Sequence, residues 1–297
     1  MSGIDRNLVP WRPDLAAESL RGVHPAERYA AGALHQAVRD TVPVRSAPDA
    51  ARGRATEMLF GETITVYEIR DGWAWGQLTA DGYVGYVEAA ALTGRIAAPT
   101  HRVGALRAFL YPEPDFKRPP AGALCFRSPV EVVETAKGYA RIRAAGEPAG
   151  WVPEVALGPL DLVEPDVVAT AQRFLGVPYL WGGRSGLGID CSGLAQIACA
   201  AAGIAIERDT YRQVQTAGTL VGTDEGAGLR RGDLVYFPGH VGLMVDGETL
   251  IHANVRAACV SLDPVREVAA RVAAEEGRGI TAVRRFGQRG LSDRVKR

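Results

Sequence analysis

Short alternating segments dominate the first half of this 297-residue chain. From about residue 37 to residue 160, apolar and polar residues alternate over a few positions and are then interrupted by Gly, Asp or Pro. Ile64 and Val66 alternate with threonines, and Trp73 and Trp75 follow in the next short segment. A period of two is typical of strands that bury one face, so we expect this region to be β-rich.

The β-rich region contains the same pattern twice. A Gly-Tyr-Val-Glu run that begins at Gly85 is echoed by a Gly-Trp-Val-Pro-Glu run that begins at Gly150, 65 residues later. Two copies of this size are too few for a solenoid. We therefore expect two small β-barrels, over residues 37–95 and 96–160. Residues 1–36 are expected to form a lead-in segment, in which Pro13 to Leu20 could make a helical turn.

Helical spacing replaces the alternation after residue 160. Apolar residues recur on one side of a segment from Pro165 to Leu175, and an almost wholly apolar run follows from Cys191 to Ala202. Both patterns predict helices. We expect strands at residues 233–237, 241–245 and 249–253. Helices combined with such a sheet predict an α+β domain over residues 161–297.

The charge, the apolar runs and the cysteines of the chain limit the partners and the compartment that we expect. Lys and Arg number 34, as do Asp and Glu, so the formal net charge is zero and gives no global attraction to nucleic acid or anionic lipid. The first residues lack the pattern of a signal peptide, and no apolar run approaches the ~20 residues of a membrane helix. Four scattered cysteines do not form a disulfide framework. We expect a reduced, cytoplasmic, monomeric protein that binds neither nucleic acid nor membrane.

Cys191 stands between a glycine-rich loop and an apolar helix. At a helix start, unpaired backbone N–H groups and the helix dipole lower the pKa of a thiol from its free value of ~8.5. This setting favours a nucleophile. The structural alternative is a small buried hydrophobe, which is the common role of a lone cysteine in such a helix. The neighbouring Asp190 is expected to be structural, because it must hold the thiol still.

His240 and His252 flank a strand–turn–strand segment around Asp-Gly at 246–247. If the loop holds only those two residues, the two histidines point to opposite faces of the hairpin. If it also includes Glu248, position 242 faces position 252, and both rings share a face. A working site therefore requires a three-residue loop or a bulge. His240 would then take the thiol proton while His252 fixes its tautomer.

An anionic tetrahedral intermediate also needs hydrogen-bond donors. The backbone N–H of Cys191 and the hydroxyl of Tyr179 are the candidates. Zinc binding by Cys191, His240 and His252 is an alternative, because thiolate and imidazole are zinc ligands. It is disfavoured because the sequence has neither Cys-x-x-Cys nor His-x-x-x-His spacing. We expect no metal and no other cofactor.

The motifs around these residues resemble those of NlpC-type cell-wall peptidases, which are papain-like cysteine peptidases that cut peptidoglycan stem peptides. The resemblance covers roughly residues 165–285. The matching runs are Pro178-Tyr-Leu-Trp-Gly-Gly, Gly188-Ile-Asp-Cys191-Ser-Gly-Leu, Arg231-Gly-Asp-Leu-Val-Tyr-Phe, Gly239-His240-Val-Gly-Leu and Leu250-Ile-His252-Ala. The resemblance implies that Cys191 is the nucleophile, His240 the base and His252 the third polar member. It also implies that Tyr179 lies near the oxyanion.

Both β-rich copies resemble bacterial SH3-like domains, and the combination resembles the intracellular branch of the family that recycles muropeptides. Enzymes of that branch cleave the bond between D-glutamate and an L-diamino acid in free peptides, and the first SH3-like domain binds the ammonium of the N-terminal L-alanine. The implied substrate-binding residues are Glu57, Tyr83, Ser192, Asp209 and Thr210, with Glu62 as the alternative to Glu57. The ordinary alternatives are a helix cap for Asp209, a barrel aromatic for Tyr83 and a solvated charge for Glu57.

The prediction is therefore a chain with two small SH3-like barrels followed by an α+β papain-like cysteine peptidase domain. Its function would be hydrolysis of the γ-D-glutamyl–L-diamino acid bond of free muropeptides. One alternative is a papain-like amidase or acyltransferase that acts on another amide. The other is a catalytically silent protein that binds cell-wall fragments, which is disfavoured because all three triad positions hold competent residues. The basic residues from Arg289 onward are expected to be a solvated terminus.

Overall fold

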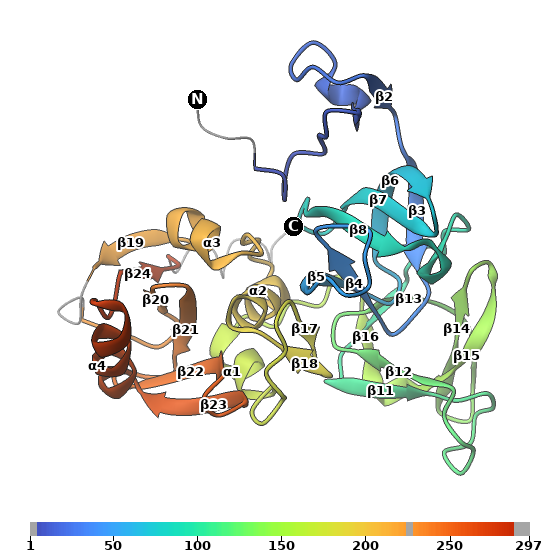
Figure 1. Cartoon of the computed structure of the whole chain (residues 1–297). Helices are drawn as coiled ribbons and strands as arrows, with labels where there is room; N and C mark the ends of the chain where they lie inside the picture. The colour runs from blue at the N-terminus through green and yellow to red at the C-terminus, as the bar shows by residue number, and fades with distance from the viewer. Residues whose placement is uncertain (1–4, 224–227, 288–297) are drawn as a thin grey trace. The chain divides into compact units, whose positions relative to one another are not determined.

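The computed structural model describes residues 5–223 and 228–287, so the basic residues from Arg289 onward lie outside the described residues (Figure 1). The chain divides into two compact units, Met1–Asp161 and Leu162–Arg297. Unit 1 consists of short strands, and unit 2 combines helices with a sheet. This division agrees with the change from alternating to helical spacing near residue 160.

Unit 1 begins with a segment that packs on its first sheet. β1 (Leu15–Ala17) pairs in parallel with β2 (Arg28–Ala30), and the 3-10 turn η1 (Glu18–Leu20) lies between them. Only η1 realises the helical turn expected between Pro13 and Leu20. Leu15 is buried with Trp75 of the sheet, which ties the lead-in segment to it.

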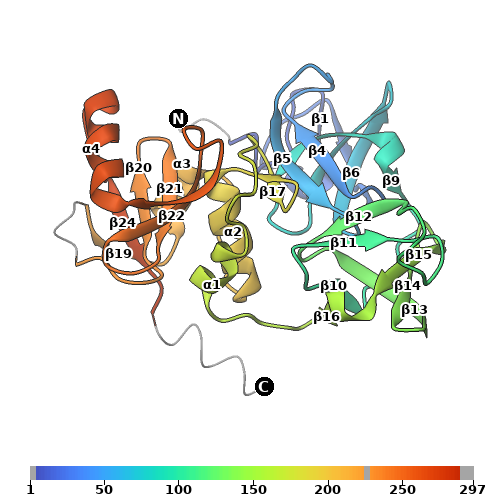
Figure 2. The ribbon, with the colours of Figure 1, turned by 90° about the horizontal axis from the view of Figure 1, so that it is seen from below.

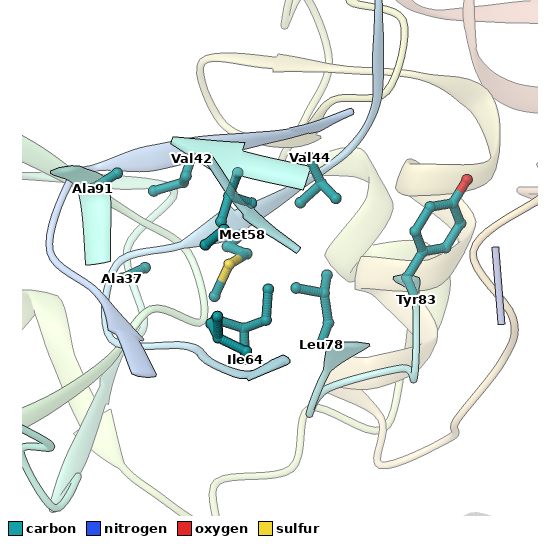
Figure 3. Close-up of a cluster of buried hydrophobic side chains, with 11 residues drawn as sticks. Ala37, Val42, Val44, Met58, Ile64, Leu78, Tyr83 and Ala91 are labelled. Carbon is teal, nitrogen blue, oxygen red and sulfur yellow. The ribbon is translucent and has the colours of Figure 1, made fainter. Parts of the chain in front are cut away.

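Seven strands form the first sheet, in the order β5-β4-β8-β7-β6-β3-β9. They are β3 (Ala33–Ala37), β4 (Thr41–Arg45), β5 (Arg54–Leu59), β6 (Thr63–Arg70), β7 (Trp73–Leu78), β8 (Val84–Glu88) and β9 (Leu92–Thr93). The sheet thus starts at Ala33, before the expected boundary at residue 37. Polar Gln36 hides this strand in the sequence; its buried amide donates to the carbonyls of Gly61 and Ala97. Figure 3 shows the core beneath the sheet, with Met58 and Ile64 in it.

The second half of unit 1 repeats the order of five of these strands in one sheet, and its other two strands form a separate two-stranded sheet. Its strands are β10 (His101–Val103), β11 (Arg107–Leu110), β12 (Gly122–Cys125), β13 (Pro129–Ala136), β14 (Tyr139–Ala144), β15 (Glu147–Pro153) and β16 (Leu157–Pro159). The order β15-β14-β13-β10-β16 matches β8-β7-β6-β3-β9 strand for strand. In both halves a 3-10 turn precedes the last strand, η2 (Ala89–Ala91) in the first and η3 (Glu154–Ala156) in the second. The pairings of the described residues give linear strand orders, so closure into barrels is not established.

Unit 2 contains a six-stranded antiparallel sheet in the order β19-β24-β20-β21-β22-β23. Its elements are α1 (Val167–Gln172), β17 (Arg184–Ser185), β18 (Gly188–Ile189), α2 (Cys191–Ala201), α3 (Thr210–Thr216), β19 (Thr219–Gly222), β20 (Leu234–Phe237), β21 (His240–Met244), β22 (Thr249–Asn254), β23 (Cys259–Pro264), α4 (Val265–Glu276) and β24 (Ala282–Arg285). The helices and strands expected in this region are confirmed. α2 packs against β21 and β22, and Figure 2 shows α2 and α4 on opposite sides of the sheet.

Candidate active site

Cys191 is the first residue of α2, and Asp190 caps this helix. Asp190 accepts hydrogen bonds from the N–H groups of Gly193 at 2.7 Å and Gly182 at 2.8 Å. Both of its oxygens also accept from the guanidinium of Arg208, at 3.0 and 2.8 Å. The Arg208 side chain is only 1% exposed. Asp190 therefore ties the glycine-rich loop to the start of the helix, which confirms its expected structural role.

The sulfur of Cys191 lies beside the strand that carries His240. It accepts a hydrogen bond from the N–H of Val241, the residue after His240, and Thr210 Oγ1 lies 4.0 Å from it. Burial raises the pKa of the Cys191 thiol to about 11, and the charge of Asp190 adds to this. The lowered pKa expected from the helix start is therefore wrong, because loss of solvent raises the pKa of the thiol by more than its hydrogen bonds and Arg208 lower it. The thiol needs a base to become a nucleophile at neutral pH.

His240 begins β21 directly after a two-residue turn. Phe237 pairs with His240 across this turn, and Gly239 adopts a φ of +64°, which a Pro-Gly turn requires and other residues rarely adopt. At the other end of β21, Leu243 pairs with Ile251. This register leaves a three-residue loop and puts position 242 opposite His252, as the sequence argument required.

The two imidazoles meet on one face of the sheet. His240 Nε2 lies 2.7 Å from His252 Nδ1, within hydrogen-bonding distance. The ring centroids are 5.0 Å apart and the planes are inclined by 64°. The predicted juxtaposition of the histidines is confirmed. The catalytic roles of the two rings depend on their hydrogen-bond partners and on their protonation.

Asp263 lies within hydrogen-bonding distance of His252, and the sequence analysis did not predict this residue. His252 Nε2 lies 2.9 Å from Asp263 Oδ2, and Ser261 Oγ donates to the same oxygen at 2.7 Å. Both residues belong to β23, where Ser261 pairs with His252. The signal was available in the sequence, because polar Ser261 and Asp263 alternate with apolar Val260 and Leu262. Alternation of this kind predicts a polar face on this strand, and the pairing with β22 places that face beside His252.

Both histidines are neutral at pH 7. Burial lowers the pKa of His240 to about 3, with a further lowering from the charges of His252 and Arg271. Burial also lowers the pKa of His252, although Asp263 partly offsets it. Burial acts to raise the pKa of Asp263, but hydrogen bonds from Ser261 and His252 hold it below its usual value. Burial thus favours a neutral base beside a protonated thiol.

Tyr179 lies close enough to Cys191 to respond to its charge. Burial raises the pKa of Tyr179 to about 12, and the charges of Cys191 and Asp190 add to the effect. The backbone N–H of Tyr179 donates to Ala258 at 2.8 Å, which anchors this residue next to β23. Its hydroxyl thus stays protonated at neutral pH and can donate a hydrogen bond.

The other implied binding residues of unit 2 have different surroundings. Thr210 lies beside the sulfur, whereas the buried hydroxyl of Ser192 donates to Asp190 at 3.3 Å and accepts from Arg208 at 2.8 Å. Asp209 is the N-cap residue of α3, as the helix-cap alternative predicts, although its side chain makes no capping hydrogen bond. The contribution of these residues to substrate binding stays a prediction.

Glu57, Glu62 and Tyr83 belong to unit 1. Glu57 is fully buried and forms an ion pair with Arg54, so it is not a solvated charge. Glu62 accepts a hydrogen bond from the N–H of Leu59 at 2.9 Å and closes the turn between β5 and β6. Tyr83 is a member of the first buried cluster, at its edge in Figure 3, as the structural alternative predicts. Their contribution to substrate binding also stays a prediction.

Residues 5–223 and 228–287 contain neither a metal-binding cluster nor a membrane-spanning helix. No group of three or more His, Cys, Asp or Glu in this part of the chain is arranged to hold a metal ion. None of the helices described there is both long enough and apolar enough to span a bilayer.

Two family models match the chain. Residues 44–92 match the bacterial dipeptidyl-peptidase Sh3 domain, and residues 176–273 match the NlpC/P60 family. Cys191 at the helix start and the paired histidines all lie within the second matched segment. The chain carries an NlpC/P60 domain after a bacterial SH3-like domain.

Similar proteins agree with this assignment. Dipeptidyl-peptidase 6 of Lysinibacillus sphaericus is 36% identical over 102 residues, which cover 34% of this chain and 36% of that protein. Gamma-D-glutamyl-L-lysine dipeptidyl-peptidase of Bacillus subtilis (strain 168) is 41% identical over 96 residues, 30% of this chain and 31% of that protein. The chain thus matches about a third of the length of these relatives.

A solved structure extends the likeness of fold to most of the chain. It is an NlpC/P60 family protein from Bacillus cereus ATCC 10987, with a TM-score of 0.72 and 20% sequence identity. The match covers 86% of this chain and 99% of that one. At this identity the likeness concerns the fold.

Proposed function

We propose that this protein is a cysteine endopeptidase that hydrolyses the γ-D-glutamyl–L-diamino acid bond of free muropeptides with an N-terminal L-alanine. The observation that carries the proposal is the 2.7 Å contact between His240 and His252, next to the Cys191 sulfur that the N–H of Val241 holds. The type of bond is supported by the name of the Bacillus subtilis relative, a gamma-D-glutamyl-L-lysine dipeptidyl-peptidase.

The reaction begins with the transfer of the Cys191 proton to His240. The thiolate attacks the γ-carbonyl carbon of D-glutamate, so that a C–S bond forms and the carbonyl oxygen becomes an oxyanion. The backbone N–H of Cys191 and the hydroxyl of Tyr179 supply hydrogen bonds to this oxygen. The protonated form of Tyr179, favoured by its burial, suits this task.

The intermediate then collapses and breaks the C–N bond. His240 gives its proton to the leaving amine of the diamino acid, and L-Ala-γ-D-Glu stays bound to Cys191 as a thioester. Water attacks the thioester carbonyl and gives a proton to His240, which returns it to the sulfur as the C–S bond breaks. The thiol and the neutral imidazole are restored, and neither an oxidant nor a metal is consumed.

We also propose that residues 96–160 form a second SH3-like domain. The order of β15-β14-β13-β10-β16 supports this proposal, because it repeats that of β8-β7-β6-β3-β9. The bridge between Tyr111 and Trp151 corresponds to the pairing of Arg45 with Tyr86 in the first half.

Action in the cytoplasm, on recycled wall peptides, is part of the proposal. Cys191, Cys199 and Cys259 are thiols that form no disulfide in the described part of the chain. A reducing compartment maintains this state.

Digestion of a defined tripeptide tests the proposed reaction. The purified chain is incubated with L-Ala-γ-D-Glu-L-Lys or the diaminopimelate analogue, and the products are separated by liquid chromatography. We expect the dipeptide L-Ala-γ-D-Glu and the free diamino acid. Cys191→Ala should abolish the products, whereas Cys199→Ala, a buried cysteine of the same helix, should retain them. Intact tripeptide with the wild-type chain, together with turnover of another amide, would refute the proposal.

A further inference from the structure

Three polar side chains from three adjacent strands form one chain of hydrogen bonds. His240 comes from β21, His252 from β22 and Asp263 from β23. The contacts measure 2.7 Å between the rings and 2.9 Å between His252 and the carboxylate. We infer that Asp263 is a positioning residue, which sets the direction of this chain and thereby makes His240 Nδ1 the proton acceptor. The inference deepens the proposed function and rests on it for the role of Cys191.

The direction of the hydrogen bonds follows from which atoms of these groups carry a proton. An ionised carboxylate can only accept hydrogen bonds, so the proton in the 2.9 Å contact must belong to His252 Nε2. A neutral imidazole carries one N–H, and His252 Nδ1 is then a lone pair that accepts from His240 Nε2. The remaining ring nitrogen of His240, Nδ1, is consequently unprotonated. Without a fixed acceptor at the end, the same heavy-atom positions would allow the reverse order.

A second arm of hydrogen bonds leads to the same carboxylate. Asn254 Nδ2 donates to Ser261 Oγ at 2.8 Å, and Ser261 Oγ donates to Asp263 Oδ2 at 2.7 Å. Asn254 is itself fixed, because its Oδ1 accepts the N–H of Ala257 at 2.8 Å. Both arms thus direct donors to Asp263 Oδ2. An oxygen with two such donors favours the ionised form of the carboxylate.

The negative charge of Asp263 also acts on His240, in addition to setting the direction of the hydrogen bonds. When His240 takes the thiol proton it becomes a cation, and a neutral second imidazole stabilises that cation less than a carboxylate does. Asp263 supplies a negative charge one ring away. Arg271 of α4 is the charged group that opposes it, since its charge lowers the pKa values of both histidines. Loss of Asp263 therefore removes a negative charge and leaves the opposing charge of Arg271 in place.

The nitrogen-15 NMR spectrum of the imidazoles tests the direction without any substrate. In the wild-type protein we expect His240 and His252 both to carry the proton on Nε2. In Asp263→Asn the new amide can donate to His252 Nε2, which moves the ring proton to Nδ1 and reverses the chain. A wild-type His252 with its proton on Nδ1 would overturn the inference, whatever the fate of the variants.

Enzyme kinetics test whether Asp263 assists the transfer of the Cys191 proton to His240. Asp263→Asn and Asp263→Ala should lower kcat on the tripeptide by about 10²-fold with little change in KM, since only proton transfer is affected. Alkylation of Cys191 by iodoacetamide at pH 7 should slow in parallel. Ser261→Ala, which removes one donor to the same oxygen, should give a smaller effect in the same direction. Glu267→Gln, which removes an exposed carboxylate from the first turn of α4, is the matched control.

The outcomes separate this inference from the proposed function. If the tripeptide is not hydrolysed but Asp263→Asn still reverses the tautomers and slows alkylation, the proposed function fails and the inference stands. If the tripeptide is hydrolysed and both Asp263 variants keep wild-type kcat and alkylation rates, the inference is wrong and the proposed function stands.

Discussion

Two carboxylates act near the candidate nucleophile, and their partners differ. Asp190 is paired with the guanidinium of Arg208, and the two side chains are 9% and 1% exposed. Asp263 is 37% exposed and is paired with the imidazole of His252. A guanidinium keeps its protons at every relevant pH, so the first pair cannot relay a proton. An imidazole has two tautomers and can take a second proton, so the second pair can direct proton transfer.

The comparison teaches that burial of a carboxylate does not by itself indicate catalysis. The more deeply buried of the two, Asp190, holds Gly182 and Gly193 in place through their N–H groups. Asp263 reaches the reacting groups only through the rings of His252 and His240. The partner of the carboxylate decides its function. Four changes test this distinction.

The largest effect is expected from deleting Glu248 from the loop between β21 and β22. The deletion leaves the two-residue Asp-Gly loop, and a shift of one residue turns the histidines to opposite faces of the sheet. Tripeptide hydrolysis should fall by about 10³-fold or more. Glu248→Ala is the control, because the residue is exposed and the loop length is kept. A deletion variant with near wild-type turnover would contradict the register argument.

Arg208→Met should destabilise the fold rather than alter the chemistry selectively. The change leaves the carboxylate of Asp190 buried without its cation, which costs about 4 kcal/mol in the free energy of unfolding. Asp263→Ala, at a more exposed position, should cost about 1 kcal/mol. Urea denaturation measures both values. Equal losses for the two variants would mean that the two pairs do not differ in the way described here.

The pH dependence of thiol alkylation sharpens the contrast between a neutral and an ionic resting state. With a thiol pKa of about 11 and a His240 pKa of about 3, both groups are neutral between these values. The thiolate fraction then rises with pH, and the alkylation rate of Cys191 should increase about tenfold per unit from pH 7 to 10. A rate that is constant from pH 5 to 9 would instead indicate a thiolate–imidazolium pair.

The smallest effect is expected at an exposed Arg–Asp pair. Arg231 contacts Asp166 at 2.8 Å, with side chains that are 45% and 50% exposed. Arg231→Ala should change the free energy of unfolding by less than about 1 kcal/mol, because solvent screens such pairs. A loss as large as that of Arg208→Met would show that burial is not the factor that separates them.

The site was predictable where local rules determine it. Alternation reduced the placement of His240 and His252 to a choice between a two-residue and a three-residue loop, and the structure has the three-residue loop that puts them on one face. The helix start sufficed for the position of Cys191. The alternation around Asp263 indicates a polar face on its own strand, but the contact with His252 was missed because it also requires the pairing of β22 with β23, which alternation does not specify. The raised pKa of the thiol escaped for a similar reason. It depends on how much solvent the folded chain removes, and a helix start alone does not reveal that.

In the β-rich unit, the repeat was visible because Gly85 and Gly150 begin similar runs. The matching strand orders agree with it. The first strand of the first sheet was missed because a buried glutamine, Gln36, satisfies its amide through long-range carbonyls. From its sequence alone, a polar residue of this kind is predicted to lie on the surface. The pair of Asp190 and Arg208 was equally hidden, since its partners are 18 residues apart.

Trapping the acyl-enzyme tests the central claim most directly. The chain is mixed with excess L-Ala-γ-D-Glu-L-Lys, quenched in acid within the first turnover, and examined by intact-mass and peptide-mapping mass spectrometry. The account predicts an added mass equal to the L-Ala-γ-D-Glu acyl group, located on Cys191 and absent from Cys191→Ala. Hydrolysis of the tripeptide by Cys191→Ala at the wild-type rate, or an adduct on another residue, would contradict it.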